Sequence, residues 1–458
     1  MTILLRSSAS TVAKTSMSRP RQNFYFLIFC TFLISTFSLN CKLRNSEVIN
    51  AEDFDGKIDF YGYKMYDFKN VSKFFSTRSA FTAVLKDGTI RTAGNPHFGG
   101  NAPHHLTNYQ SMYFSPDIND VFSTGCAFSV LKSDKTVESW GCQQSGGFLS
   151  KELKNKLKNV KNIFSNLVSF AALAGNSTDK DFIITWGAPT SGGEITKGRN
   201  IISIGPVETI ESTNFAFAAL LKDGRVFAWG NPCCGGSIPK NIQLSGIIKI
   251  FSTKSSFAAL KDDGTVITWG KPEFGGEIPK DLFPYLKDVK TIVPSFNSFI
   301  ALKNDGTIVS WGGNTLEYKS VWMKINNVRD VITNGEAFVA LKLDNSVESW
   351  GNSYLGGNID FYGNISSNLK NVKSIVSTNR AFAALKFDGT IVTWGDPYQG
   401  GWIDSENDDI HNVKYIMSSK FDFIAVKNDG TYIIWGNSEY THTKAYRKLY
   451  ISENNFLC

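Results

Sequence analysis

The most regular segment of this chain reads Ser256-Phe257-Ala258-Ala259-Leu260-Lys261-Asp262-Asp263-Gly264-Thr265-Val266-Ile267-Thr268-Trp269-Gly270. Versions of it occur nine times along the 458 residues, 39 to 47 residues apart. Each copy carries one aromatic marker, at Phe81, Phe128, Phe170, Phe217, Phe257, Phe299, Phe338, Phe382 and Phe423. Trp-Gly ends eight copies, and Ala93-Gly94 ends the first. Self-similarity at this period predicts a stacked or circular array of one small unit.

Each copy is expected to form three short β-strands. In the eighth copy these cover residues 373–377, 381–386 and 390–394. An Asp-Gly pair separates the last two strands, and this predicts a two-residue hairpin turn whose residues both accept positive φ. Lys135 replaces the turn Gly in the second copy. The third copy has an insertion from Ala174 to Lys180, which predicts a longer hairpin.

The strands are apolar on both faces, and this determines how the copies must pack. A three-stranded sheet is not stable alone in water, so each sheet needs a neighbour on both sides. Sheets packed face to face around an axis form a β-propeller. We therefore predict an all-β fold, a single closed β-propeller of nine repeats of about 43 residues with three main antiparallel strands each. The alternative is a seven-bladed ring with extra repeats. Because Trp recurs in every blade but the first, we expect it to fill the space between blades rather than to stack on a ligand.

The repeat resembles that of the regulator of chromosome condensation superfamily. The shared pattern is Ala-Leu-Lys-x-Asp-Gly-x-Val-x-x-Trp-Gly followed by a Gly-Gly turn such as Gly275-Gly276, and it covers about residues 55 to 437. The resemblance implies a propeller, usually of seven blades. Short-bladed bacterial members of the superfamily include a β-lactamase inhibitor, and some other relatives act on small GTPases. The family's usual Asn-x-x-Gly-Gln-Leu-Gly ending is replaced here by variants such as residues 231–236.

The N-terminus indicates export. Arg19 and Arg21 precede a mostly apolar run over residues 24–39, which is typical of a secretory signal and short for a membrane-spanning helix. We expect residues 1–41 to be a signal sequence, with translation starting at Met1 or Met17. Residues 42–54 form a linker, 55–437 the propeller and 438–458 a C-terminal tail. Cys41 stands where a bacterial lipoprotein would carry its lipid, so a cell-surface or periplasm-facing lipoprotein and a secreted protein are the two alternatives.

Two cysteines of the second copy are candidates for a disulfide. Cys126 and Cys142 flank the hairpin almost symmetrically, which places them opposite each other on neighbouring strands. Export is compatible with a bridge, and two buried thiols are the alternative. Cys233 and Cys234 are adjacent in a loop, where a bridge would be strained. No cysteine or histidine spacing predicts zinc.

Catalytic signatures are absent from the sequence. It has no phosphate-binding loop and no nucleophile elbow, and its five histidines fall in expected loops or in the tail. The net charge of +7 is mild and mixed with acidic residues, which argues against nucleic-acid binding. We expect no enzyme activity, no cofactor and no metal.

Sequence variation concentrates after the Gly-Gly turns, in loops that such scaffolds use for binding. Trp322 and Trp402 lie outside the repeated Trp positions, so they are candidate partner contacts or, alternatively, cover a blade edge. We expect a monomeric, exported, non-catalytic propeller that binds a protein or surface macromolecule, with membrane contact only through a lipid anchor. The alternatives are a guanine-nucleotide exchange factor-like regulator of a small GTPase and a protein inhibitor of an enzyme.

Overall fold

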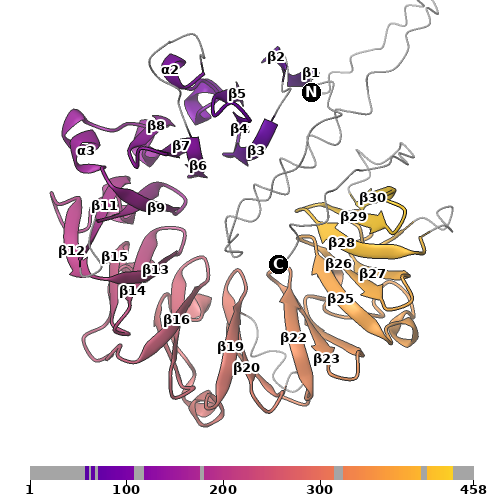
Figure 1. Cartoon of the computed structure of the whole chain (residues 1–458). Helices are drawn as coiled ribbons and strands as arrows, with labels where there is room; N and C mark the ends of the chain where they lie inside the picture. The colour runs from indigo at the N-terminus through magenta and orange to yellow at the C-terminus, as the bar shows by residue number, and fades with distance from the viewer. Residues whose placement is uncertain are drawn as a thin grey trace, which may run out of the picture.

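The chain is a β-propeller of nine blades. A computed structural model describes residues 57–60, 63–67, 71–107, 118–175, 180–313, 323–403 and 410–436. In this part of the chain, eight sheets have three strands, one has four, and a separate hairpin has two. The nine larger sheets follow one another around a common axis, with the first strand of each blade innermost and the third outermost (Figure 1). The predicted all-β fold and nine-repeat propeller are therefore confirmed.

The strand boundaries repeat from blade to blade. The inner strands are β3 (Val71–Ser76), β6 (Ile118–Ser123), β9 (Val160–Ser165), β13 (Val207–Ser212), β16 (Ile247–Ser252), β19 (Val289–Pro294), β22 (Val328–Thr333), β25 (Val372–Ser377) and β28 (Val413–Ser418). The middle strands are β4 (Ala80–Leu85), β7 (Ala127–Lys132), β10 (Ser169–Ala174), β14 (Ala216–Leu221), β17 (Ser256–Lys261), β20 (Ser298–Lys303), β23 (Ala337–Lys342), β26 (Ala381–Lys386) and β29 (Asp422–Lys427). The outer strands are β5 (Ile90–Gly94), β8 (Val137–Gly141), β11 (Asp181–Gly187), β15 (Val226–Gly230), β18 (Val266–Gly270), β21 (Ile308–Gly312), β24 (Val347–Gly351), β27 (Ile391–Gly395) and β30 (Tyr432–Gly436).

Shorter elements also occur in the part of the chain that the structure describes. The two-stranded hairpin consists of β1 (Lys57–Phe60) and β2 (Tyr63–Asp67), and β12 (Ile201–Gly205) is the fourth strand of the third blade. Two short α-helices follow the first and second blades, α2 (His104–Thr107) and α3 (Lys151–Lys156). The described 3₁₀ turns are η2 (Pro96–Phe98), η3 (Gln143–Ser145), η4 (Pro189–Ser191), η5 (Pro232–Cys234), η6 (Pro272–Phe274), η7 (Lys280–Tyr285), η9 (Ser353–Leu355) and η10 (Ser366–Asn368).

The hairpin between the middle and outer strands differs from the predicted two-residue turn. In the fifth blade, Lys261 N–H donates to Thr265 O at 2.9 Å, so three residues form the loop. Gly264 has φ +76°, whereas Asp263 is not among the residues with positive φ. This is a type I turn followed by one left-handed residue. Only that last position needs the left-handed region, and in the second blade Lys135 adopts it with φ 64°. The Asp263 carboxylate accepts two hydrogen bonds from Thr265, one from its N–H and one from its hydroxyl.

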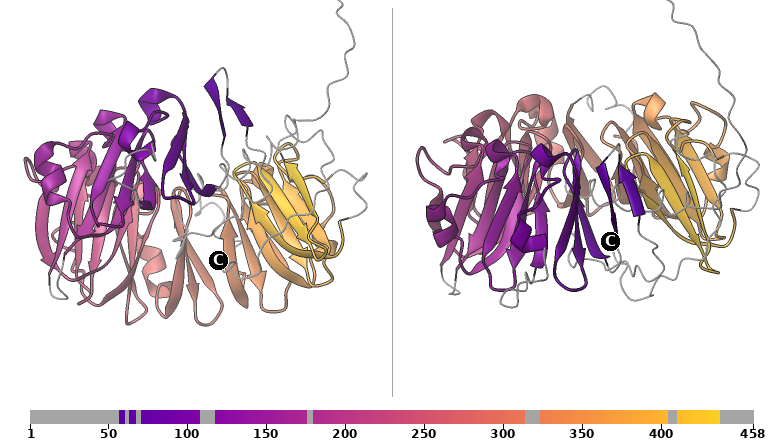
Figure 2. Two further views of the ribbon diagram at one scale, coloured as in Figure 1. Left: turned by 45° about the horizontal axis from the view of Figure 1, so that its top comes forward. Right: turned by 90° about the horizontal axis from the view of Figure 1, so that it is seen from above.

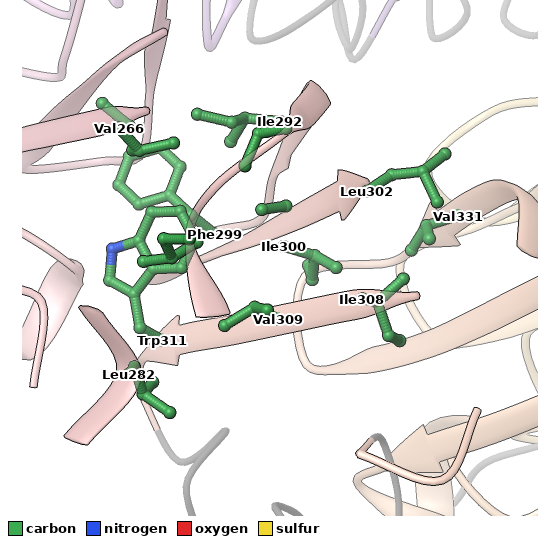
Figure 3. Packing of buried hydrophobic residues seen from close by; sticks show 14 of the residues in the cluster. Val266, Leu282, Ile292, Phe299, Ile300, Leu302, Ile308, Val309, Trp311 and Val331 are labelled. Carbon is green, nitrogen blue, oxygen red and sulfur yellow. The ribbon is translucent and has the colours of Figure 1, made fainter. Parts of the chain in front are cut away.

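From the second blade on, each blade packs a Phe–Trp pair against the preceding blade. Phe299 and Trp311 lie opposite each other on neighbouring strands, with ring centroids 5.5 Å apart. Figure 3 shows this pair against Val266 of the preceding blade, with Val331 of the next blade beyond the far end of the sheet. A Cβ atom on Gly275 of the preceding blade would lie 2.7 Å from the Phe299 ring, so only glycine allows this approach. The expected position of the repeated Trp between blades is therefore confirmed.

Hydrogen bonds fix both ends of the contact between consecutive blades. At one end the Trp indole N–H donates to a Gly carbonyl oxygen of the preceding blade, in the pairs Trp140–Gly99, Trp229–Gly192, Trp269–Gly235, Trp311–Gly275, Trp394–Gly356 and Trp435–Gly400. At the other end the first residue of an inner strand donates its N–H to a hairpin of the preceding blade, in the pairs Val160–Lys135, Ile247–Gly224, Val289–Gly264, Val328–Gly306, Val372–Asn345 and Val413–Gly389. Where both bonds occur, they set the rotation of a blade relative to its neighbour. The indole N–H groups of Trp186 and Trp350 are buried without a hydrogen-bond partner, so the junctions of the third and seventh blades with the blades before them lack the Trp–Gly bond.

The third blade uses a side chain where six other blades use the hairpin carbonyl. Its longer hairpin joins β10 to β11, with Ala174 opposite Phe182. Strand β11 also pairs with β12, and Val207 N–H of the fourth blade donates to the Asp181 carboxylate at 2.9 Å. Lys161 Nζ lies 2.6 Å from the other carboxylate oxygen. The predicted long hairpin is confirmed. Its consequence is a buried carboxylate at one blade junction.

The ends of the array differ from the other junctions. Ala93 lies opposite Phe81 in the first blade, where the other blades have Trp. Unlike the other repeat phenylalanines, Phe81 is only half-buried. The β1–β2 hairpin lies between the first and ninth blades in all views (Figures 1 and 2). The Trp–Gly bond that joins other blades therefore cannot form where the ninth blade meets the first.

Candidate binding surface

One side of the propeller carries the 3₁₀ turns that follow the outer strands. In the seventh blade Asn352 caps η9, its side chain accepting a hydrogen bond from Tyr354 N–H. Gly356 then takes φ +96°, and Gly357 packs against the backbone of Gly351, which a Cβ atom would meet at 2.4 Å. Asp396 performs the same capping role in the eighth blade, accepting from Tyr398 N–H at 3.0 Å. This geometry holds the middle residue of each turn at the surface.

Aromatic side chains occupy these middle positions in the seventh and eighth blades. Tyr354 is 63% exposed and Tyr398 is 74% exposed. Phe361 and Tyr362, in the segment that joins the two blades, are 41% and 46% exposed. We call Tyr354, Phe361, Tyr362 and Tyr398 the aromatic cluster. Exposed aromatic groups of this kind are enriched in protein interfaces.

Three rings of the cluster, those of Tyr354, Phe361 and Tyr362, meet edge to face. Tyr354 and Phe361 have centroids 4.9 Å apart and an interplanar angle of 64°. Phe361 and Tyr362 have the same separation and an angle of 86°. The connecting segment is held in place by Asp360, whose carboxylate accepts hydrogen bonds from the Ile365 and Ser366 N–H groups at 2.8 Å each. These bonds lower the pKa of Asp360, so it is ionised at neutral pH.

An ion pair lies beside the cluster. Arg380 Nε and the Asp396 carboxylate are 2.6 Å apart. Partial burial raises the pKa of the Tyr362 phenol, and the charge of Asp396 raises it further. Tyr354 and Tyr398 also act on this phenol electrostatically. Tyr354 belongs to the turn of the seventh blade and Tyr398 to that of the eighth, so side chains of both turns influence Tyr362.

Of the two tryptophans predicted as partner contacts, Trp402 lies within the described residues and Trp322 does not. Trp402 follows the Gly-Gly turn of the eighth blade and is 62% exposed, so most of its side chain is in solvent. Trp322 lies outside the described residues, as does Cys41. Sequence reasoning did not single out any member of the aromatic cluster, although Phe361 and Tyr362 lie in one of the variable loops that it assigned to binding. The available signal was Tyr at the same turn position of two consecutive repeats, Tyr354 and Tyr398.

Cys126 and Cys142 lie directly opposite each other, next to the paired residues Ala127 and Gly141. Cys142 N–H donates to Cys126 O at 3.0 Å, and the two thiols are within hydrogen-bond reach. Both are free thiols in the structure, so the bridge remains a prediction. Burial, together with the neighbouring thiol, raises the pKa of Cys126 to about 11.

The described residues contain no group of three or more His, Cys, Asp or Glu side chains arranged to hold a metal ion. His105 Nε2 lies 2.6 Å from the Glu138 carboxylate, and its imidazole is exposed whereas the carboxylate is largely buried. Within the same ranges, no helix has the length and apolar character needed to cross a membrane.

The chain is similar to known proteins only at the level of solved structures. No protein-family model matches the chain, and no curated protein matches it. Prp20p from Saccharomyces cerevisiae, described with its binding properties to Gsp1p and histones, matches with 16% identity over 76% of this chain and 75% of that one, at a TM-score of 0.30. The computationally designed Ika8 protein matches with 14% identity over 70% and 96% of the two chains, at 0.31. The C-terminal domain of gp131 from bacteriophage phiKZ matches with 10% identity over 80% and 92%, at 0.30. Scores this low carry no conclusion about activity.

Proposed function

We propose that this protein is an exported, non-catalytic β-propeller that binds another macromolecule through the side of the ring that carries the 3₁₀ turns. The aromatic cluster is the observation that supports this function most directly. Its four rings come from the turns of two blades and the segment between them, and each is more than a third exposed. Desolvating rigid aromatic groups of this size is a main source of binding energy in protein interfaces.

The other parts of the proposal rest on the sequence. The basic and apolar N-terminus supports export, with Cys41 as a lipid attachment site if the signal is of the lipoprotein type. The repeat pattern supports membership of the regulator of chromosome condensation superfamily. We assign the protein no cofactor and no nucleic-acid partner, and we expect it to be a monomer.

A crosslinking experiment tests the binding side. A photoreactive residue replaces either Tyr398 or Phe387, which lie at opposite ends of β27 and are both strongly exposed. On the native full-length protein in its own surroundings, we expect a specific crosslinked partner from position 398 and none from position 387. The same crosslink from both positions, or one from position 387 alone, would remove the assignment of binding to this side.

A further inference from the structure

The aromatic cluster forms a corner rather than a flat platform. Interplanar angles of 64° and 86° turn successive rings nearly at right angles. A sugar ring or a nucleic-acid base stacks on one flat face. A compact cation can instead contact two ring faces at once, and aromatic cages use this arrangement to hold ammonium groups.

The charges around the corner favour the same kind of ligand. Asp360, adjacent to Phe361, keeps its negative charge because two N–H groups bind its carboxylate. Glu336 is exposed and accepts a hydrogen bond from Asn352, the cap of the turn that carries Tyr354. Arg380 is paired with Asp396 and so does not neutralise these two acids. A locally acidic aromatic surface on a chain of net charge +7 is complementary to a cation.

The fifth blade shows that such a contact forms on this side of the ring. There Lys271 Nζ lies 5.1 Å from the ring centroid of Phe274, within the turn equivalent to that of Tyr354. A second lysine, Lys254, lies 4.0 Å from the ring centroid of Phe296. In the fifth and sixth blades the chain supplies the cation itself. No cation–π contact within the described residues involves the aromatic cluster of the seventh and eighth blades.

We propose that the aromatic cluster binds cationic side chains, lysine, arginine or a methylated form, on an extended segment of a protein partner. The proposal rests on the proposed function and names the chemistry of that same site. The phenol and phenyl faces hold the cation, and the carboxylates of Asp360 and Glu336 attract it. The partner is therefore a basic protein segment rather than a glycan or an acidic peptide.

Fluorescence anisotropy on the purified full-length protein tests this, with a labelled peptide of alternating Lys and Gly as the probe. A peptide of alternating Glu and Gly is the matched control. We expect saturable binding of the Lys peptide alone, weakened by added salt. Exposed cation–π contacts contribute about 0.5–1 kcal/mol each, so Tyr354→Leu combined with Tyr362→Leu should weaken binding about fivefold to thirtyfold. Tyr362→Phe keeps the ring and should bind nearly as the native protein does.

Leu343→Ala combined with Phe387→Ala provides the control, since both residues are exposed at the opposite ends of the same two blades. This variant should bind the Lys peptide with unchanged affinity. Equal loss in both double variants, no binding of the Lys peptide, or preference for the Glu peptide or a neutral oligosaccharide would overturn the cation assignment. If the position-398 crosslink still forms while the Lys peptide fails to bind, the binding function stands and only the ligand chemistry is wrong.

Discussion

The indole Nε1 of Trp269 donates a hydrogen bond of 2.9 Å to the carbonyl oxygen of Gly235 in the preceding blade. The ring of Phe257 packs directly against the same glycine, because the glycine has no side chain to separate the two blades. The Trp and Gly-Gly signatures of the repeat are therefore two halves of one contact, formed between successive copies. Repeats that bind their neighbours in this way share their stability across junctions.

Removing this tryptophan should destabilise the ring. Trp269 is 1% exposed, and truncation of a buried Trp costs about 3–5 kcal/mol. We expect Trp269→Ala to lower the melting temperature clearly. Trp402→Ala should leave it nearly unchanged, because the Trp402 side chain is largely in solvent. Circular dichroism melts of the two variants compare these effects, and equal destabilisation would place Trp402 in the core.

The glycine half of the contact can be tested separately. A Cβ on Gly235 would lie 2.5 Å from the Phe257 ring, and its φ is +91°. Gly205 has a similar φ of +99° but nothing within 4 Å of a built Cβ. Both Ala variants should lose about 1–2 kcal/mol for the left-handed backbone. Urea unfolding should show a substantially larger loss of unfolding free energy for Gly235→Ala alone. Equal losses in the two variants would show that the close approach between blades is not needed.

The repeat predicted the strands and their packing, because the same apolar positions and glycines return in every copy. The turn type at Asp263-Gly264 was predicted incorrectly. The dipeptide does not reveal whether the preceding residue belongs to the loop, and a hydrogen bond outside the dipeptide decides this. Strand β12 was missed because residues 201–205 have no counterpart in the other copies.

The candidate site was predictable only in part. Trp402 was found because it departs from the repeated Trp positions. Tyr354 and Phe361 come from a turn and a connecting segment that meet only through folding. The Asp360 hydrogen bonds that hold this connecting segment are not encoded by any repeat pattern.

The junction between the third and fourth blades should depend on Asp181. Its carboxylate accepts the buried Val207 N–H and pairs with Lys161. An unsatisfied buried donor costs about 1–3 kcal/mol, so Asp181→Ala should lower unfolding stability by about that amount. Asp181→Asn keeps an acceptor and should lose less. The exposed helix pair Glu152–Lys156 provides the control, since Glu152→Ala should scarcely change the melting temperature. An equal effect of Asp181→Ala and Glu152→Ala would mean that the carboxylate does not support the junction.

Acid should lower the stability of the fold at pH values where the hairpin aspartates of the folded protein are still largely ionised. Hydrogen bonds from Thr307 and Thr390 lower the pKa of Asp305 and Asp388 to about 2. Because these folded-state values lie below the ordinary value of 3.8, the carboxylates stabilise the fold at higher pH. That contribution is lost as pH falls from about 4 to about 2. Melts across this range should show a falling melting temperature, and Asp305→Asn combined with Asp388→Asn should flatten the curve. An unchanged slope in the double variant would assign the acid sensitivity to other groups.

The facing thiols of Cys126 and Cys142 should form a disulfide, but slowly. They are directly opposite in an antiparallel pair, where Cα separations suit a bridge. The thiolate is the reactive form, and the raised pKa of Cys126, about 11, keeps it protonated at neutral pH. Oxidation of purified protein should therefore accelerate as pH rises toward that value.

The bridge closes a loop of about seventeen residues, for which chain-entropy estimates give roughly 3 kcal/mol. We expect a smaller gain, because the hairpin is already held by its strand pairing. Peptide mass analysis of exported material without reduction should show the two cysteines linked. Complete alkylation of both residues in that material would mean that the protein uses them as buried thiols.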